Sequence, residues 1–389
     1  MSEATITYKI ALAEYLSGTS DNISLFWKGR VALYALLKSY GIKKDDEIIL
    51  PAFTCVVVPN AIIYCEAKPV YVDINPQTLN CDPEEIKKKI TDRTKVIIAQ
   101  NTFGLSSDLD GIMKIAREKN IIVIEDCTHG LGGFYKGKKN GTIADASFFS
   151  TQWNKPFSTG IGGMAFSSDT AIAKKMQKFE EDAISPGFME RMQLSVLLKA
   201  RSIMKAPAIY WPMIKLYRFL SKNNLVVGSS QGNELETPSM SEGFLKKLAE
   251  VQANKGISEL KQLDAYNLHR IEISKKYNEC LSSLEITPPF QPDYATHTFL
   301  KYPLLVKDRN EFLKLAEKEN IELGDWFLSP IHPVVKDFEK WNYTMGAFPI
   351  AEYVSAHIVN LPTHPGMRES SILKICEFLS KNKSMLITE

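Results

Sequence analysis

The chain has 389 residues, of which 44% are hydrophobic and 24% charged, a balance typical of a globular protein with a large core and two domains. Its 47 basic and 45 acidic residues leave a net charge of +2, which gives no general electrostatic reason to expect nucleic-acid binding. The six cysteines form no CxxC pair, so we expect neither a zinc site nor a disulfide framework. Neither a signal peptide nor a long apolar run is apparent, so we expect no spanning helix and a cytoplasmic location.

From residue 26 to residue 167, helical patterns alternate with short apolar runs, which is typical of an α/β fold with a mostly parallel sheet. The apolar runs predict strands at Glu47–Leu50, Pro69–Asp73, Lys95–Ala99, Ile121–Glu125, Ala146–Phe149 and Gly163–Phe166. Amphipathic spacing predicts helices at Gly29–Tyr40, Val57–Cys65, Pro83–Ile90 and Leu109–Lys119.

Beyond residue 168 the pattern changes to longer helices, predicted at Glu242–Leu263 and Asp264–Leu281. Candidate strands at Phe299–Val306 and Ile321–Leu323 and a helix at Glu369–Lys381 then predict a smaller α+β domain. We therefore expect an N-terminal segment at 1–25, a large domain at 26–240, connecting helices at 241–283 and a small domain at 284–389.

Residues 189–222 are predicted to form a helical insertion in the large domain. Within it, Met192–Leu220 carries basic, aliphatic and aromatic residues and no acidic residue, and Pro207 and Pro212 predict a division into two short helices. A segment of this kind can lie on an anionic membrane surface. It can also cover the active site or pack against a partner subunit, and we favour this second interpretation because amphipathic helices are more often buried against protein.

Ligands of parallel sheets bind beyond the carboxyl ends of strands, and chemically active residues follow two of the predicted strands. Asp126 follows the run ending at Glu125, although an isolated carboxylate there can simply cap the next turn. Ser150 ends a later strand, and Lys155 stands five positions on. A phosphate needs hydroxyl and backbone N–H donors, and a reactive amine must lie near the same ligand. A lone lysine is usually a surface charge, so the combination of these residues carries the prediction.

These residues lie within an ordered series of segments, GRVALYALLKSYGIKKDDEIILPAFT, IIVIEDCTHGLGGFYKGKKNGTIADASFFS, the Asn154–Lys155 pair and VNLPTHPGM. From about Gly29 to Leu379 the chain resembles the DegT/StrS-type sugar aminotransferases, which have the fold-type-I aspartate-aminotransferase architecture. The resemblance implies pyridoxal 5'-phosphate as the cofactor and a homodimer with composite active sites. It also implies transfer of an amino group from glutamate to a keto group of a nucleotide-linked sugar, for surface glycan or secondary-metabolite biosynthesis.

The resemblance assigns roles to individual residues. Lys155 would form the Schiff base with the cofactor and then carry the proton. Asp126 would keep the pyridine nitrogen protonated, which makes the ring an electron sink. Ser150 would bind the phosphate, together with Gly29 and Arg30 at the start of the first helix of the sheet domain.

Several positions depart from the family pattern. Lys28-Gly29-Arg30 stands where Ser-Gly-Thr is common, and Cys55 stands where many relatives have an aromatic residue that stacks on the cofactor ring. His129 replaces a usual glutamine and could bind the phenolic oxygen, stack over the ring or be held by the loop backbone. The family's NYRM segment is approximately TPSM here, at 237–240, so its contact with the neighbouring subunit is not assigned.

The remaining histidines and one tryptophan are less specific. His297, Trp326 and His332 lie where relatives form part of the acceptor pocket, and Trp326 serves equally well as a core or interface residue. His269, His357 and His364 have no metal-ligand spacing and are interpreted as structural, so no metal is expected.

Three other functions compete with transamination. A lyase of the same fold, such as a cysteine desulfurase, generally has histidine directly before the lysine, where this chain has Asn154. The dehydratase branch of the family replaces the lysine with histidine, whereas Lys155 is kept. A catalytically silent homologue with a regulatory or assembly role is disfavoured by the joint presence of Asp126, Ser150 and Lys155.

Overall fold

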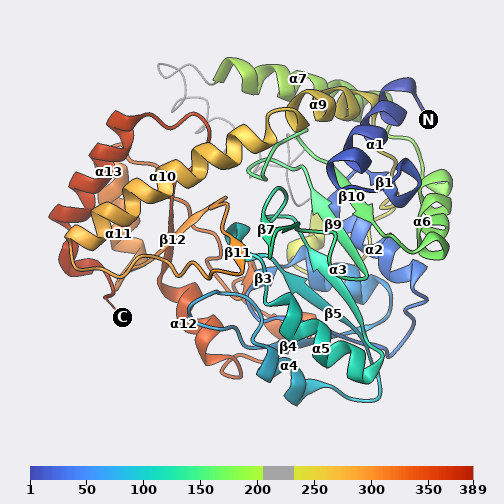
Figure 1. The fold of residues 1–389 in the computed structure, drawn as a ribbon, viewed down its shortest axis with the longest axis horizontal. Coiled ribbons are helices and arrows are strands. Elements are labelled where there is room, and N and C mark those ends of the chain that lie inside the picture. The colour runs from blue at the N-terminus through green and yellow to red at the C-terminus, as the bar shows by residue number, and fades with distance from the viewer. Residues whose placement is uncertain (205–231, 389) are drawn as a thin grey trace.

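The computed structural model describes residues 1–204 and 232–388, and its centre is a seven-stranded sheet in the order β1-β10-β9-β6-β5-β2-β4 (Figure 1). The strands are β1 (Ile23–Phe26), β2 (Glu47–Pro51), β4 (Lys68–Val72), β5 (Thr94–Gln100), β6 (Ile122–Asp126), β9 (Ala146–Ser150) and β10 (Gly163–Phe166). Strand β10 runs antiparallel to both of its neighbours, and the pairs from β9 to β4 are all parallel. The predicted α/β class is confirmed, and each predicted strand of this sheet is found to within one residue at either end.

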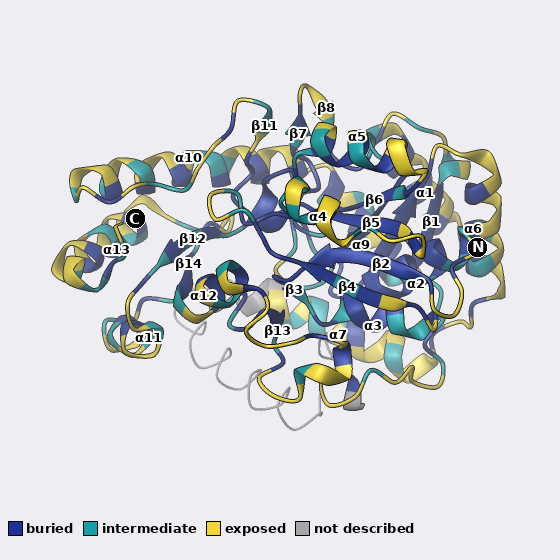
Figure 2. Cartoon of the chain, turned by 90° about the horizontal axis from the view of Figure 1, so that it is seen from below, coloured by how far each residue is buried: buried dark blue, intermediate teal, exposed yellow. Residues whose placement is uncertain are grey.

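The sheet is covered on both faces because its strands are apolar on both sides (Figure 2). Ile48 and Leu50 of β2 pack in the same core as helices α2 (Gly29–Ser39) and α3 (Val57–Tyr64). Ile49, between them, packs in the core formed with α4 (Pro83–Lys89) and α5 (Leu109–Lys119). The four predicted helices are thus confirmed, and α6 (Thr170–Asp182) adds a helix that the pattern did not predict.

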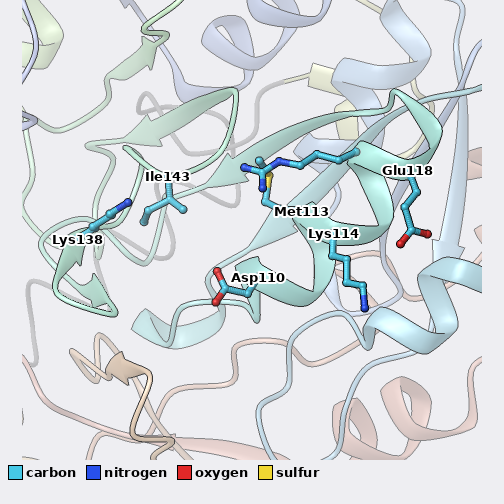
Figure 3. A pocket seen from close by; sticks show the side chains of 7 residues that line it. Asp110, Met113, Lys114, Glu118, Lys138 and Ile143 are labelled. Atoms are coloured by element: carbon cyan, nitrogen blue, oxygen red, sulfur yellow. The ribbon is translucent and has the colours of Figure 1, made fainter.

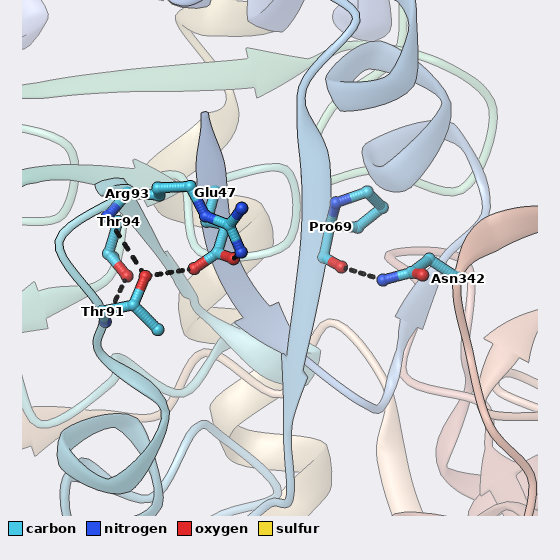
Figure 4. A network of polar contacts seen from close by, with 6 residues as sticks. All are labelled: Glu47, Pro69, Thr91, Arg93, Thr94 and Asn342. Carbon is cyan, nitrogen blue, oxygen red and sulfur yellow. Dashed lines mark hydrogen bonds and ion pairs between the residues drawn. The ribbon is translucent and has the colours of Figure 1, made fainter. Parts of the chain in front are cut away.

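Polar contacts fix the amino-terminal edge of the sheet (Figure 4). The Glu47 carboxylate at the start of β2 accepts hydrogen bonds from the Thr91 hydroxyl at 2.5 Å and from Arg93 Nη2 at 3.0 Å, just before β5. On the outer strand β4, the Asn342 amide donates to the carbonyl of Pro69 at 2.8 Å. These contacts leave the opposite, carboxyl-terminal edge for ligands.

The amino-terminal residues pack onto the large domain. Helix α1 (Glu3–Tyr15) lies against α9 (Glu250–Leu260), and Tyr8 and Leu12 belong to a core shared with β1 and β10. The helix predicted at Glu242–Leu263 is wrong in its first eight residues. Residues 246 and 247 instead form extended bridges to Ile184 and Phe26, while Phe244 and Leu248 bury their side chains without a helix.

The carboxyl-terminal part is a separate α+β layer around its own core. Strand β12 (Tyr302–Leu305) pairs antiparallel with β14 (Ile358–Leu361). Helices α10 (Leu263–Ser283), α11 (Arg309–Lys318) and α13 (Glu369–Lys381) pack with these strands, whereas α12 (Pro349–His357) contributes to the core of the large domain. The strand predicted at Ile321–Leu323 is wrong, because only Gly324 bonds to the backbone of Asn360 there. The domain limits stay a prediction.

Short elements complete the described chain, namely β3 (Thr54–Cys55), β7 (Phe134–Tyr135), β8 (Lys138–Lys139), β11 (Ala295–Thr296) and β13 (Ile331–His332). Helix α7 (Phe188–Met204) forms the first part of the predicted insertion. Pro207, Pro212 and the rest of that segment lie outside the described residues. Across 1–204 and 232–388, no helix combines the length and the apolar character that crossing a bilayer requires.

Candidate active site

The carboxyl ends of the central strands bring the predicted site residues together. Asp126 is the last residue of β6, and Ser150 is the last residue of β9, the neighbouring parallel strand. The chain after β9 passes through Lys155 before it returns as β10. The ends of two adjacent strands therefore carry the carboxylate and the hydroxyl, and the segment after the second strand carries the amine, as the sequence predicts.

Lys155 lies in a partly buried position under an aromatic side chain. Its Nζ is 5.0 Å from the centre of the Trp326 ring, which is a cation–π distance. Burial lowers the pKa of Lys155, while the nearby Cys55 and Asp126 oppose this shift. A lysine of lowered pKa is more often neutral at physiological pH and can act as a nucleophile or base.

Asp126 is buried, and the Thr128 backbone N–H donates to its Oδ1 at 2.9 Å. Burial raises the pKa of this carboxyl, while the hydrogen bond from Thr128 and the charge of Lys155 lower it. The pKa of Asp126 therefore depends on whether a positive group lies next to it. A cationic ligand nitrogen would favour the charged carboxylate.

His129 is fully enclosed by backbone and aromatic rings. The Phe103 backbone N–H donates to its Nδ1 at 3.3 Å, which assigns the proton of the neutral ring to Nε2. Its ring centre lies 5.4 Å from that of Trp326 and 5.9 Å from that of Phe327. Burial and the charge of Lys155 lower the pKa of His129 well below its usual value, so the ring is neutral.

Gly29 and Ser150 form a small cradle at the start of α2. A Cβ atom at Gly29 would lie 3.0 Å from Ser150 Cβ and 3.3 Å from Ser150 Oγ, so only glycine leaves this space open. The first N–H groups of α2 and the Ser150 hydroxyl can then reach the same ligand, and a helix amino terminus favours an anion. The cradle fits a phosphate group.

Arg30 differs from the expected arrangement because it forms a buried ion pair with Glu234, in the short helix η3 (Gly232–Leu235). Lys28 is also partly buried, and burial together with Arg30 lowers its pKa to about 8. Glu234 is not among the site residues predicted from the sequence. The only signal was that Glu234 is the first acidic residue after Glu190.

Two of the three acceptor-pocket candidates, Trp326 and His332, lie next to each other, and the third, His297, packs on a different ring. Cys55 on β3 is paired with His332 on β13, and the His332 ring lies 4.9 Å from that of Trp326. His297 instead stacks on Phe299 at 3.7 Å between ring centres. Trp326, Cys55 and His332 therefore lie together beside Lys155.

The remaining residues that were singled out in the sequence differ in their exposure and in their contacts. Thr237, Ser239 and Met240 of the TPSM segment are exposed. His357 Nδ1 contacts the Val306 carbonyl at 2.9 Å, and Gly366 N–H donates to His364 Nδ1 at 3.1 Å. Within the described part of the chain, no group of three or more histidine, cysteine or acidic side chains could hold a metal ion.

A surface hollow on the outer side of α5 is separate from this site (Figure 3). It is lined by charged and aliphatic side chains, Asp110, Met113, Lys114, Arg117, Glu118, Lys138 and Ile143. None of them is a predicted site residue. The chemistry-bearing residues lie instead at the carboxyl edge of the sheet.

Comparison with known proteins identifies the family. The model described as the DegT/DnrJ/EryC1/StrS aminotransferase family matches residues 7–380. The chain belongs to this family. Its resemblance to DegT/StrS-type aminotransferases, predicted from the sequence, is therefore confirmed.

Individual relatives cover most of the chain. An uncharacterised protein of Methanocaldococcus jannaschii is 31% identical over 358 residues, covering 90% of this chain and 82% of that protein. The GDP-perosamine synthase of Caulobacter vibrioides is 28% identical and covers 91% of this chain and 83% of that protein. The dTDP-3-amino-3,6-dideoxy-alpha-D-galactopyranose transaminase of Aneurinibacillus thermoaerophilus is 27% identical and covers 95% and 86%.

Solved structures share the fold. The Streptococcus pneumoniae protein Spr1654 in its PLP form has a TM-score of 0.76 at 20% identity, covering 100% of this chain and 93% of that chain. The NtdA protein of Bacillus subtilis, with bound cofactor PMP, has a TM-score of 0.75 at 22% identity and covers 98% and 77%. The predicted fold type is confirmed.

Proposed function

We propose that this member of the family is a pyridoxal-phosphate-dependent aminotransferase that transfers an amino group, with glutamate as donor, to a keto group of a nucleotide-linked sugar. The observation that carries the proposal is the convergence of Lys155, Asp126 and Ser150 at one edge of the sheet, with Gly29 beside the serine. Relatives that bear the names of amino-sugar enzymes support the substrate class. Relatives solved with PLP or PMP support the cofactor.

The chemistry of the site residues suits this cofactor. Asp126 is a buried carboxylate able to pair with the pyridine nitrogen, and the Gly29–Ser150 cradle accepts the phosphate. The rings of His129 and Trp326 lie 5.4 Å apart, and Lys155 Nζ lies 5.0 Å from the Trp326 ring, so both aromatic groups are close to the reactive amine. When bound, pyridoxal phosphate supplies an electron sink and a carrier for the amino group.

The chain's own groups then hold the substrate and move one proton. Lys155 Nζ would take a proton from the amine-bearing carbon of the donor and would later give it up at a different carbon atom, so that the amino group can leave the donor; the lowered pKa of Lys155 favours this role. His129 is neutral and can donate a hydrogen bond from Nε2. The Trp326 ring lies 5.0 Å from Lys155 Nζ and can limit the access of water to that side of the amine.

The decisive experiment is chemical labelling of the lysine. Borohydride reduction of the purified enzyme in the presence of pyridoxal phosphate should fix the cofactor to a peptide that contains Lys155, detected by mass spectrometry. Glutamate should bleach the visible absorbance of the enzyme, and the correct keto sugar should restore it. A protein that stays colourless with added pyridoxal phosphate would instead support a catalytically silent homologue.

A nitrogen-15 transfer experiment separates transamination from a lyase activity of the same fold. A transaminase converts glutamate to 2-oxoglutarate in one turnover and transfers the nitrogen to the sugar. A lyase would release a fragment of its substrate without any need for a second substrate. Nitrogen-15 from labelled glutamate should therefore appear in the sugar product.

The proposal extends to assembly and location. We propose a cytoplasmic homodimer with composite sites; the exposure of Ser239 and Met240 in the TPSM segment supports the dimer, because an exposed segment can contact a second subunit. Analytical ultracentrifugation should find a dimer at working concentrations. An active monomer would contradict the composite site.

Peripheral membrane contact through residues 192–220 stays a subordinate proposal, and packing against protein remains favoured. The described part of this segment is helical, and its Met192 and Val196 side chains are exposed. Liposome flotation tests the alternative. Binding to anionic but not neutral vesicles, lost when Lys215 and Arg218 become glutamate, would favour the membrane.

A further inference from the structure

The ladder of β12 and β14 has two faces with different surroundings. Tyr302 pairs with Leu361, and both side chains lie in the core of the small domain. Side chains alternate along a strand, so Lys301 and Asn360 lie on the opposite face. Leu305, on that same face, packs against the core of the large domain. Lys301 and Asn360 are therefore directed toward the side where the candidate active site lies.

Asn360 is 1% exposed and has only part of its amide in use. Its Oδ1 accepts a hydrogen bond from the Trp326 backbone N–H at 2.9 Å, and the Trp326 ring covers Lys155. Its Nδ2 has no hydrogen-bond partner among the described residues. Buried polar groups are normally paired, so this donor indicates a ligand that is held next to Trp326.

Lys301 is a partly buried cation that makes no hydrogen bond or ion pair with the described residues. Burial lowers its pKa to about 8, and the charges of Arg270 and Lys155 act in the same direction. Glu322 and Asp325 oppose the shift and help to keep the lysine charged, although neither forms an ion pair with it. A cation that has lost much of its hydration and forms no ion pair favours binding of an anion.

We propose that Lys301 and Asn360 form the subsite that binds a carboxylate of the amino donor. This inference rests on the proposed aminotransferase function. The amine that Lys155 must approach and the α-carboxylate share one carbon atom, so a carboxylate subsite has to lie within a few bonds of the lysine. The diphosphate of a nucleotide sugar is separated from the keto carbon by the sugar ring, which places it farther from Trp326.

Binding of an unreactive dicarboxylate tests this subsite without catalysis. Calorimetry on the holoenzyme should show that Lys301→Met weakens glutarate binding by about 10- to 100-fold, as expected for loss of a charged hydrogen bond. Lys301→Arg should retain most of the affinity. Asn360→Leu keeps the size but removes the Nδ2 donor together with the Oδ1 acceptor of the Trp326 backbone N–H, and it should weaken glutarate binding by a smaller factor.

A matched control and a second ligand make the result specific. Lys307 is exposed and lies two residues beyond the end of β12, so Lys307→Met should bind glutarate as the parent does. A nucleoside diphosphate should bind Lys301→Met with unchanged affinity. Unchanged glutarate affinity in Lys301→Met, or a loss confined to the nucleoside diphosphate, would overturn the proposal.

The proposed function has its own separate readout. If the parent enzyme transfers nitrogen from glutamate but Lys301→Met binds glutarate normally, the subsite alone is wrong. If borohydride fixes no cofactor to Lys155 in the parent enzyme, the aminotransferase function itself is wrong.

Discussion

Arg270 Nη2 donates a hydrogen bond of 2.7 Å to the carbonyl oxygen of Pro156, the residue that follows Lys155. The same side chain binds Asn267 Oδ1 through Nη1, and the Asn267 amide donates to the Leu131 carbonyl at 3.2 Å. Leu131 lies in the loop that follows Asp126. Helix α10 thus holds the loop that carries Lys155 and the loop that follows Asp126 in fixed relation.

Arg270→Met should lower kcat by about 100-fold with a smaller change in KM, because a loop displaced by about 1 Å misaligns Lys155 with its substrate. Burial lowers the pKa of Arg270 to about 10, so the side chain is still a cation at neutral pH. Arg270→Lys should recover part of kcat. A raised KM with unchanged kcat would assign Arg270 to substrate binding instead.

Lys155→Ala should abolish turnover by several orders of magnitude while the fold is kept, because the residue lies in a loop and adds little to the core. Steady-state rates and circular dichroism provide the two measurements. Lys174→Ala, at an exposed position on α6, is the matched control and should behave as the parent. Turnover near that of the parent would refute the assignment of Lys155.

Asp126→Asn should still bind the cofactor but lose activity by about 100- to 1,000-fold, because an amide cannot stabilise a protonated ring nitrogen as a carboxylate does. Burial raises the pKa of Asp126, so removing the charge should not lower stability. Thermal unfolding and single-turnover rates with glutamate measure the two effects. Full activity would show that Asp126 only orders the turn at Thr128.

Acid should destabilise the protein because three buried histidines are neutral in the folded chain. Burial lowers the pKa of His297 to about 3, that of His332 to about 4, and that of His129 well below its usual range. Unfolded histidines bind protons below about pH 6.5, so this stability is complete above that pH and is lost on acidification toward the folded values. Each group contributes up to about 1.4 kcal/mol per pH unit in that window.

His297→Asn separates one of these contributions. The Phe299 backbone N–H donates to His297 Nδ1 at 3.1 Å, and the asparagine carbonyl can replace that acceptor without titrating. Urea unfolding midpoints at pH 7.5, 6 and 5 should fall less steeply in the variant than in the parent, at fixed cofactor concentration. Parallel curves for the two proteins would show that His297 does not titrate on unfolding.

The sequence predicted β6 and β9 and the residues at their ends because buried parallel strands read as unbroken apolar runs followed by polar residues. Phe244 and Leu248 show where such patterns mislead. Their spacing of four residues is that of a helix face, yet both residues lie in an irregular segment and are buried there. Helix α9 begins only at Glu250. Local spacing does not distinguish the two cases because tertiary contacts decide between them.

The sequence pattern did not predict which distant segments contact each other. Arg30 and Glu234 are 204 residues apart, and β3 pairs with β13 to set Cys55 beside His332. Neither segment carries a signal that names its partner. The position of Trp326 in the sequence made it a candidate for the acceptor pocket. Its place next to Lys155 follows only from the fold of the small domain.

Gly29→Ala should weaken cofactor binding more than it lowers stability. The added methyl group would lie 3.0 Å from Ser150 Cβ and 3.2 Å from the Phe149 carbonyl, so the serine or the start of α2 must move by a few tenths of an ångström. That shift separates the Ser150 hydroxyl from the helix N–H groups that together form the cradle. Alanine also has a better helix propensity than glycine, which offsets part of the strain.

Titration of the apoenzyme with pyridoxal phosphate should show a raised Kd in Gly29→Ala and also in Ser150→Ala. Gly187→Ala, whose added methyl group meets only Glu190 Oε2 at 3.6 Å, is the control and should leave the Kd unchanged. Equal cofactor affinity in Gly29→Ala and the parent would mean that the phosphate binds elsewhere.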